Sequence, residues 1–293
     1  MTKVTLGLCV KNSARTVSHT LNSIRSQRFP SDQMELIVVD GLSTDGTLQI
    51  MENYLDSSAE FNYEILSDGG LGLAYARQLV LQKSKGDFIV WVDGDHILPS
   101  NYVKNQLEFM EKHPRVGAAE AITLPAPNSN WVARLEGYTW TIYGLRNLDK
   151  FVQSVDSAGT IYLKRAMTEA GGYDTRFKKA GEDGDISRRI VKKGWKLAIN
   201  PNAYYYHICR DSFRGLFHEY YNWGMGAYMV GKKHVGAVSP ARFFLAPLAG
   251  FLLAIKVAKK FHDSASLLLP LHYTLKRAAW LWGYYSGHIK GLS

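Results

Sequence analysis

The sequence contains only two cysteines, Cys9 and Cys209, among its 293 residues. They provide neither a disulfide framework nor the spacing of a zinc site. Cys9 lies in an apolar run, so we expect a buried free thiol there, and a reducing compartment suits this composition. Hydrophobic residues make up 46% of the chain and charged residues 21%. These fractions exclude a disordered chain and allow one large domain or two modest ones.

Long apolar runs are also missing. The charge-free stretch at residues 243–255 has 13 residues and contains Pro247, whereas a helix that spans a membrane needs about 20. A shallow hairpin in one leaflet therefore fits better than a clean span, and a buried helical hairpin is the alternative. The run at residues 4–10 is too short for a signal peptide, and we expect it to form the first strand.

Positive charge gathers at the C-terminal end of the chain. Residues 204–293 hold 11 Lys and Arg against three Asp and Glu, and so carry eight of the nine net positive charges. The same residues are rich in aromatic side chains and Leu. This combination favours an anionic membrane surface over nucleic acid as a partner, and the alternative is a solvated basic face over an ordinary core. We therefore expect residues 212–293 to form a helical, membrane-associated region.

The first part of the chain alternates apolar runs with helical patterns. Strands are predicted at 4–10, 36–40, 63–66, 87–92, 116–124 and 159–163, and helices after Ser13 as N-cap, from Thr47, and at 71–84, 100–112, 131–145 and 184–193. Near-continuous apolar strands separated by helices predict an α/β fold with a mainly parallel sheet between helices. Ligands of such sheets bind at the carboxyl ends of the strands. Asp40 and Asp93 both lie at such ends.

The triplet Asp93-Gly94-Asp95 is the most informative local feature. It follows an apolar strand directly, and Gly94 allows the backbone to come close to a ligand. Paired carboxylates suit Mg²⁺ or Mn²⁺, and these cations suit a diphosphate. The triplet alone is equally typical of a turn.

Two further segments offer polar groups at predicted helix starts. Glycines at 69–72 precede Arg77 and permit the close approach of an anion. The segment 181–185 holds Glu182, Asp183 and Asp185, which are typical helix caps. As a functional group they offer a general base, because mutual repulsion raises the pKa of at least one carboxyl group.

Taken together, four segments resemble the family 2 glycosyltransferases. They are V-V-D-G-x-S-x-D-G-T at 38–47, A-R at 76–77, D-G-D at 93–95 and G-E-D-x-D-x-x-x-R at 181–189. They occur in the order of the family and at about its spacings, and the resemblance extends over residues 3–235. Residues 213–226 and the apolar tail are similar to membrane-linked exopolysaccharide transferases of the succinoglycan type.

The resemblance implies the nucleotide-binding α/β fold called GT-A for residues 1–211. It implies inverting transfer of a sugar from a nucleotide-diphospho-sugar, with Mg²⁺ or Mn²⁺, to a hydroxyl of a lipid-linked or polysaccharide acceptor. The expected location is the cytoplasmic face of the cell membrane, peripheral or shallowly inserted, and no nucleic acid partner is expected.

For the donor side, the resemblance assigns nucleotide contacts to Asp40 and Arg77, and a ribose or metal contact to Asp93. Asp95 would bind the metal. Lys11 and Asn12 stand at the end of the first strand, where the family usually has tyrosine-asparagine, and would contact the nucleotide base.

For the acceptor side, the resemblance makes Asp183 the base that takes the acceptor's hydroxyl proton. Glu182 would orient the acceptor or Asp183. His207 matches a histidine near the metal or diphosphate, with an ordinary histidine beside three tyrosines as the alternative. His96 departs from the commonest residue after the acidic pair and is a candidate for tuning the choice of metal.

Two other functions are compatible with this kind of sheet. A sugar-phosphate nucleotidyltransferase would carry a glycine-rich, arginine-containing loop after the first strand, and residues 10–16 lack it. A non-catalytic scaffold subunit would be expected to lose carboxylates, whereas Asp93, Asp95 and Asp183 are intact. A retaining mechanism would need a nucleophile against the anomeric carbon, which the sequence leaves open.

Overall fold

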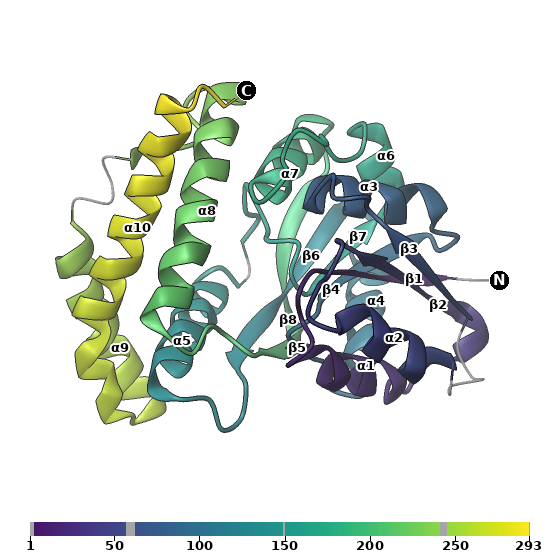
Figure 1. Cartoon of the computed structure of the whole chain (residues 1–293), viewed down its shortest axis with the longest axis horizontal. Coiled ribbons are helices and arrows are strands. Elements are labelled where there is room, and N and C mark those ends of the chain that lie inside the picture. The colour runs from purple at the N-terminus through teal and green to yellow at the C-terminus, as the bar shows by residue number, and fades with distance from the viewer. Residues whose placement is uncertain (1–2, 57–61, 149, 241–244, 293) are drawn as a thin grey trace.

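A computed structural model describes residues 3–56, 62–148, 150–240 and 245–292. A twisted sheet with helices on both faces forms one side of the molecule, and long C-terminal helices form the other (Figure 1). The N-terminal half of the chain builds the outer part of the sheet. The C-terminal helices lie beyond its opposite edge.

The sheet has the strand order β3-β2-β1-β4-β7-β6-β8-β5 within the described residues. The strands are β1 Val4–Val10, β2 Met34–Asp40, β3 Asn62–Ser67, β4 Phe88–Asp93, β5 His96–Ile97, β6 Val116–Pro125, β7 Thr160–Leu163 and β8 Lys196–His207. Strands β1 to β4 pair in parallel, as do β6 and β8, whereas β7 and β5 are antiparallel to their neighbours. The prediction of a mainly parallel α/β sheet is therefore confirmed.

Both faces of the sheet are covered by helices. α1 (Val17–Arg25), α2 (Thr47–Asp56) and α4 (Tyr102–Lys112) pack on one face, and α3 (Leu73–Lys83), α6 (Lys164–Glu169) and α7 (Glu182–Lys192) pack on the other. A short 3₁₀ helix, η1 (Ser31–Gln33), precedes β2. Leu8 of β1 packs in the core on the α1 side of the sheet, and Cys9 packs in the core on the α3 side. Successive residues of β1 are therefore apolar on both faces. Gly7 has no side chain because a Cβ there would lie 2.5 Å from the ring of Trp91 in β4.

Ser13 does not cap α1, and that prediction is wrong. The helix begins at Val17, and its N-cap Thr16 makes no side-chain capping bond. The N–H of Ser13 donates instead to Oγ1 of Thr47 at 2.7 Å. The loop after β1 is therefore fixed by the first residue of α2.

The C-terminal helices pack on one another and on α5 (Trp131–Arg146) (Figure 1). They are α8 (Phe213–Lys233), α9 (Ala246–Phe261), η3 (Ser264–Leu268) and α10 (Leu269–Ile289). Glycines bring α8 and α10 together, since a Cβ on Gly224 would lie 2.0 Å from the carbonyl oxygen of Trp280. Among the helices described, none is both long enough and apolar enough to cross a membrane. Residues 241–244 of this region lie outside the described residues.

Candidate active site

Three neighbouring strands bring the predicted nucleotide-binding residues to one edge of the sheet. Val10 at the end of β1 pairs with Asp40 of β2, and Cys9 pairs with Asp93 of β4. Lys11 and Asn12 follow β1 directly. The four predicted positions at these strand ends are therefore close neighbours.

The loop after β2 holds Asp40 and Asn12 in place. Oδ2 of Asp40 accepts a hydrogen bond from the N–H of Ser43 at 3.0 Å, and Oδ1 of Asn12 accepts one from Thr44 at 2.9 Å. Within the described residues, Oδ1 of Asp40 is buried and has no hydrogen-bond partner. A buried acceptor of this kind is normally satisfied. Asp40 is thus suited to accept a bond from a base N–H or a ribose hydroxyl.

Arg77 of α3 joins the strand end to the start of α7. Its Nη1 forms a short ion pair with Oε1 of Glu182, and its Nη2 lies 3.4 Å from Oδ1 of Asp93. The guanidinium also lies 5.6 Å from the centre of the Trp91 ring. The buried guanidinium therefore lies between the carboxylates of Glu182 and Asp93 and holds them close together. Its predicted contact with a nucleotide stays a prediction.

The glycines before α3 make room for protein backbone. Asp68 accepts hydrogen bonds from the N–H groups of Gly70 at 2.7 Å and Gly72 at 3.0 Å. Gly72 has φ of 101°, and a Cβ there would lie 2.5 Å from the carbonyl oxygen of Lys178. That oxygen accepts from the N–H of Leu73 at 3.0 Å. The close approach seen at Gly72 is therefore to the loop before α7.

A cavity of about 380 Å³ lies between the sheet edge, the start of α7, and helices α8 and α10. Its polar wall includes the carboxyl groups of Asp93, Asp156, Glu182 and Asp183, and its aromatic wall consists of Trp140, Tyr220, Trp223 and Trp280. The structure therefore brings Asp183 to the same cavity as Asp93, although the two are far apart in the sequence.

The surroundings of Asp183 favour a proton acceptor. Burial raises its pKa, against the opposing charge of Arg77. Burial also raises the pKa of Glu182 to about 7, with Arg77 lowering it and the charge of Asp183 adding to the rise. A carboxyl group whose pKa lies nearer to neutrality is a more effective general base.

Asp156 is a cavity residue that the sequence analysis did not single out. Burial, followed by the charge of Asp183, raises its pKa to about 7. Its N–H donates to Oε2 of Glu120 at 3.2 Å. The one sequence feature that pointed to Asp156 is its position just before the predicted strand at 159–163. Because β7 is antiparallel to β4, the start of β7 lies at the edge where β4 ends.

A candidate metal centre lies beside the cavity. Asp95, His96 and His207 each offer one ligand atom, and these atoms lie within 4.8 Å of one another. The pairing of β5 with β8 places His96 opposite His207, and Nε2 of His207 lies 3.5 Å from Oδ2 of Asp95. A carboxylate and an imidazole so close together suit a divalent transition metal such as Mn²⁺.

Hydrogen bonding assigns a different part to His96. The N–H of Asp93 donates to its Nδ1 at 3.2 Å. Burial lowers its pKa to about 4, so the ring is neutral and its proton lies on Nε2. Nε2 is 3.8 Å from one oxygen each of Asp93 and Asp95. At that distance the buried Nε2 makes no hydrogen bond to a described residue. His96 therefore supports the acidic pair through the N–H of Asp93.

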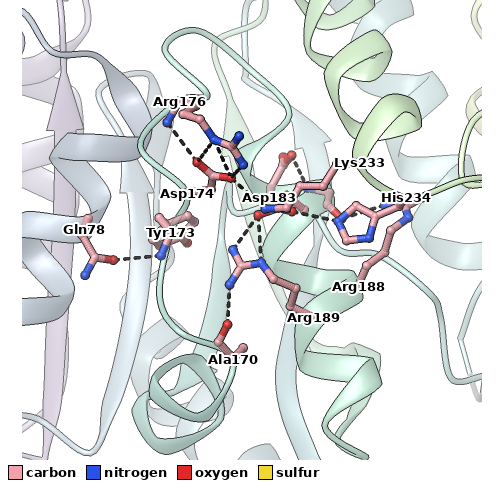
Figure 2. A network of polar contacts seen from close by, with 12 residues as sticks. Gln78, Ala170, Tyr173, Asp174, Arg176, Asp183, Arg188, Arg189, Lys233 and His234 are labelled. Carbon is pink, nitrogen blue, oxygen red and sulfur yellow. Dashed lines mark hydrogen bonds and ion pairs between the residues drawn. The ribbon is translucent and has the colours of Figure 1, made fainter. Parts of the chain in front are cut away.

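Packing between α7 and α8 fixes the position of Asp183. Asp185, two residues further on, forms ion pairs with Lys233 at 2.7 Å and with His234 at 2.8 Å. Figure 2 shows Lys233 and His234 at the end of α8, beside Arg189 of α7. At the other end of the contact, a Cβ on Gly226 of α8 would lie 2.4 Å from the carbonyl oxygen of Ala180. The start of α7 is thus held from both sides.

Comparison with known families identifies the family of the chain. The profile described as "Glycosyl transferase family 2" matches residues 5–170, and the one described as "Glycosyl transferase family group 2" matches residues 88–287. The chain belongs to glycosyl transferase family 2. The predicted resemblance is therefore confirmed, and the nucleotidyltransferase alternative is set aside.

Two curated relatives of this family 2 protein differ in how much of it they cover. Poly(ribitol-phosphate) β-N-acetylglucosaminyltransferase TarS of Staphylococcus aureus is 32% identical over 102 residues, which are 35% of this chain and 18% of TarS. The dolichyl N-acetyl-α-D-glucosaminyl phosphate 3-β-D-2,3-diacetamido-2,3-dideoxy-β-D-glucuronosyltransferase of Methanococcus voltae is 22% identical over 316 positions, covering 96% of each chain. The match to TarS thus spans less than a fifth of that protein.

Solved structures show the same fold. The mannosyltransferase PcManGT from Pyrobaculum calidifontis, solved in complex with GDP-Man and Mn²⁺, superimposes with a TM-score of 0.70. It is 17% identical, and the match covers 98% of this chain and 87% of PcManGT. A structure of residues 1–349 of Staphylococcus aureus TarS gives a TM-score of 0.54 at 17% identity, covering 99% and 92% of the two chains. The GT-A-like fold is therefore established.

Proposed function

We propose that the protein is a metal-dependent, inverting glycosyltransferase that transfers a sugar from a nucleotide-diphospho-sugar to a hydroxyl of a lipid-linked or polysaccharide acceptor. The observation that carries this proposal is the cavity shared by Asp183 at the start of α7 and Asp93 at the end of β4. The candidate metal centre at Asp95 and His207 lies beside it. A proton acceptor and a diphosphate site then border one space suited to a sugar.

The strand ends form the donor side. The unpartnered oxygen of Asp40 suits the nucleoside, with Lys11 and Asn12 beside it. A divalent cation held by Asp95 and His207 would neutralise charge that develops on the leaving diphosphate. PcManGT was solved with both GDP-Man and Mn²⁺ bound, which supports this assignment for a chain of the same fold.

Asp183 acts on the acceptor side as the general base. Its raised pKa suits removal of the proton from an acceptor hydroxyl. The oxygen then attacks the anomeric carbon on the face opposite the diphosphate, and the configuration inverts. Glu182, held by Arg77, fixes the backbone just before Asp183. This path needs one base and no covalent sugar intermediate.

The C-terminal helices present an apolar face that suits a membrane surface. Leu248, Phe251, Leu252 and Ile255 form an exposed stripe at helical spacing along α9. Exposed Leu267, Leu268 and Leu271 follow on η3 and α10. Lys256, Lys259 and Lys260 belong to the same helix, and basic side chains beside an apolar stripe are typical of helices that lie in the interface of an anionic bilayer.

The relatives and the thiols support this setting. The name of the Methanococcus voltae relative describes a dolichyl-linked acceptor, and that of TarS describes a poly(ribitol-phosphate) acceptor. Cys9 and Cys209 are free, buried thiols, which suits the reducing side of a membrane. We therefore place the protein at the cytoplasmic face of the cell membrane, peripheral or shallowly inserted.

A donor panel tests the proposed function. UDP-, GDP- and dTDP-sugars are supplied with Mg²⁺ or Mn²⁺, and release of the nucleoside diphosphate is measured with and without a lipid-linked acceptor. We expect one donor to be turned over, to require the cation, and to yield a product of inverted anomeric configuration by NMR. Turnover that is unchanged in a chelator, or a retained configuration, would contradict the corresponding part of the proposal.

A further inference from the structure

A second cavity, of about 410 Å³, lies between α5, α9 and α10. Trp140, Tyr220 and Arg277 line both this cavity and the one that Asp183 faces. The two spaces therefore adjoin. A molecule that presents a hydroxyl to Asp183 could extend into the second cavity.

The second cavity is basic. Arg146 at the end of α5 and Lys150, four residues further on, line it from one side, and Lys276 and Arg277 line it from α10. No carboxyl group lines it among the described residues. Behind the wall, Glu136 balances Lys276 through an ion pair of 2.7 Å. The exposed cations Arg146 and Lys150 leave an excess of positive charge at the mouth.

Aromatic rings hold the α10 cations in place. The guanidinium of Arg277 lies 4.7 Å from the centre of the Tyr273 ring, and Nζ of Lys276 lies 5.2 Å from the same ring. Both cations also lie within 6.0 Å of the centre of the Tyr220 ring. Such contacts restrict long side chains before a ligand arrives. A basic residue at the end of a helix is ordinary, but three cations on two helices, with Lys150 just beyond one of them, form a site around one cavity.

The cavity also has an apolar wall that continues to the surface. Ile142 and Leu253 line it. Leu252, the neighbour of Leu253 on α9, is 53% exposed and belongs to the apolar stripe described above. A ligand with an anionic group in the cavity and an apolar chain along α9 would therefore bury both parts.

We propose that the second cavity binds the phosphate or diphosphate group of the acceptor. This inference rests on the proposed function and specifies its acceptor: a hydroxyl-bearing molecule whose phosphate is anchored by Arg146, Lys150 and Arg277 while the hydroxyl reaches Asp183. Guanidinium groups match phosphate oxygens through paired hydrogen bonds. A phosphate of this kind occurs on lipid phosphates and on polyol-phosphate polymers. The apolar wall favours the lipid source.

The test is equilibrium binding to the full-length protein without any donor. Farnesyl phosphate, farnesol and glycerol 3-phosphate are titrated by calorimetry. We expect farnesyl phosphate to bind about tenfold or more tightly than farnesol, and the double variant R146Q/K150Q to lose about tenfold or more of that affinity. The matched control K192Q/K193Q removes the same charge from the end of α7, outside the cavity lining, and should change affinity by no more than about twofold.

Each outcome decides a separate point. Weaker binding of glycerol 3-phosphate than of farnesyl phosphate supports a lipid acceptor, and equal binding supports a polyol-phosphate acceptor. The inference is overturned if farnesol binds as well as farnesyl phosphate, or if the control variant loses as much affinity as R146Q/K150Q. Because no donor is present, phosphate binding without turnover in the donor panel would refute the proposed function alone. Turnover with a neutral acceptor and no phosphate binding would refute this inference alone.

Discussion

Arg77 and Glu182 form a buried ion pair that joins α3 to the first turn of α7, and their side chains are only 4% and 3% exposed. Asp93 lies on the other side of the guanidinium, with 3.4 Å between Nη2 and Oδ1. Because Asp183 follows Glu182 directly, this pair fixes the candidate base relative to the end of β4. Stability and catalysis are therefore linked at one arginine.

We expect Arg77→Met to lower the free energy of unfolding by about 3–5 kcal/mol, because it leaves Glu182 buried without its partner. The double variant R77M/E182M removes both charges and should regain part of that loss, since an apolar pair can replace a buried ion pair. Urea denaturation followed by circular dichroism measures both. A double variant less stable than R77M would show that Glu182 has other partners.

Asp183→Asn should leave donor affinity nearly unchanged and lower the rate of transfer by about 10²- to 10⁴-fold, the usual contribution of a general base. Asn keeps the size of the side chain but cannot accept the proton. The matched control is Asp156→Asn in the same cavity, which should reduce the rate less. Calorimetry with the preferred donor and single-turnover transfer separate binding from chemistry. If the two variants lose the transfer rate equally, Asp183 is not the general base.

Asp156 should make the protein less stable as pH rises toward neutrality. Burial and the charge of Asp183 raise its pKa from 3.8 to about 7, so between these values the folded protein holds a proton that the unfolded chain releases. Its stabilising contribution is complete below about pH 4 and is lost as pH rises through about 7. We expect Asp156→Asn to flatten this dependence by on the order of 1–2 kcal/mol, since the group is only half-buried. Urea midpoints of the wild-type protein and the variant, measured from pH 4 to 8, test this. The prediction is contradicted if the stability of both proteins falls equally as pH rises.

The strands β1 and β2 could be predicted from sequence because they are buried on both faces. Residues 4–10 and 36–40 are nearly continuous apolar runs, and the structure has strands at Val4–Val10 and Met34–Asp40. The direction of β7 could not be predicted, because an apolar run carries no sign of whether its neighbour is parallel. β5 is only two residues long and exists through its pairing with β8.

In the candidate site, too, some residues could be predicted from the sequence and others could not. Asp40, Asp93 and Asp183 stand at strand or helix ends within motifs, so their residue types and positions pointed to them. Asp156 has no motif and reaches the cavity through the antiparallel return of β7. The basic cavity depends on how α5 and α10 pack, and helical periodicity in one sequence does not specify which two helices will share a wall.

Substitutions at the metal centre distinguish a ligand from a supporting group. Asp95→Asn and His207→Ala should each weaken Mn²⁺ binding by about 10- to 100-fold or more. His96→Gln should cost much less, because the N–H of Asp93 donates to Nδ1 of His96, and the amide oxygen of Gln can also accept this hydrogen bond. Mn²⁺ titration followed by electron paramagnetic resonance measures the three affinities. If H96Q loses as much affinity as H207A, His96 is itself a ligand and its proton is on Nδ1.

The exposed stripe on α9 gives the last prediction. Phe251 is 56% exposed in the middle of that stripe, and burying one such side chain in a bilayer interface is worth about 1.5–3 kcal/mol. Phe251→Asp should therefore weaken co-sedimentation with phosphatidylcholine vesicles that contain phosphatidylglycerol by about tenfold or more. Val235→Asp is the matched control, because Val235 is 97% exposed but lies outside α9, η3 and α10. Both variants add one negative charge, so a general electrostatic effect would weaken them equally, whereas contact through the stripe affects F251D alone. High salt should weaken the wild-type protein only in part, since the lysines of α9 are screened but the apolar contact is not.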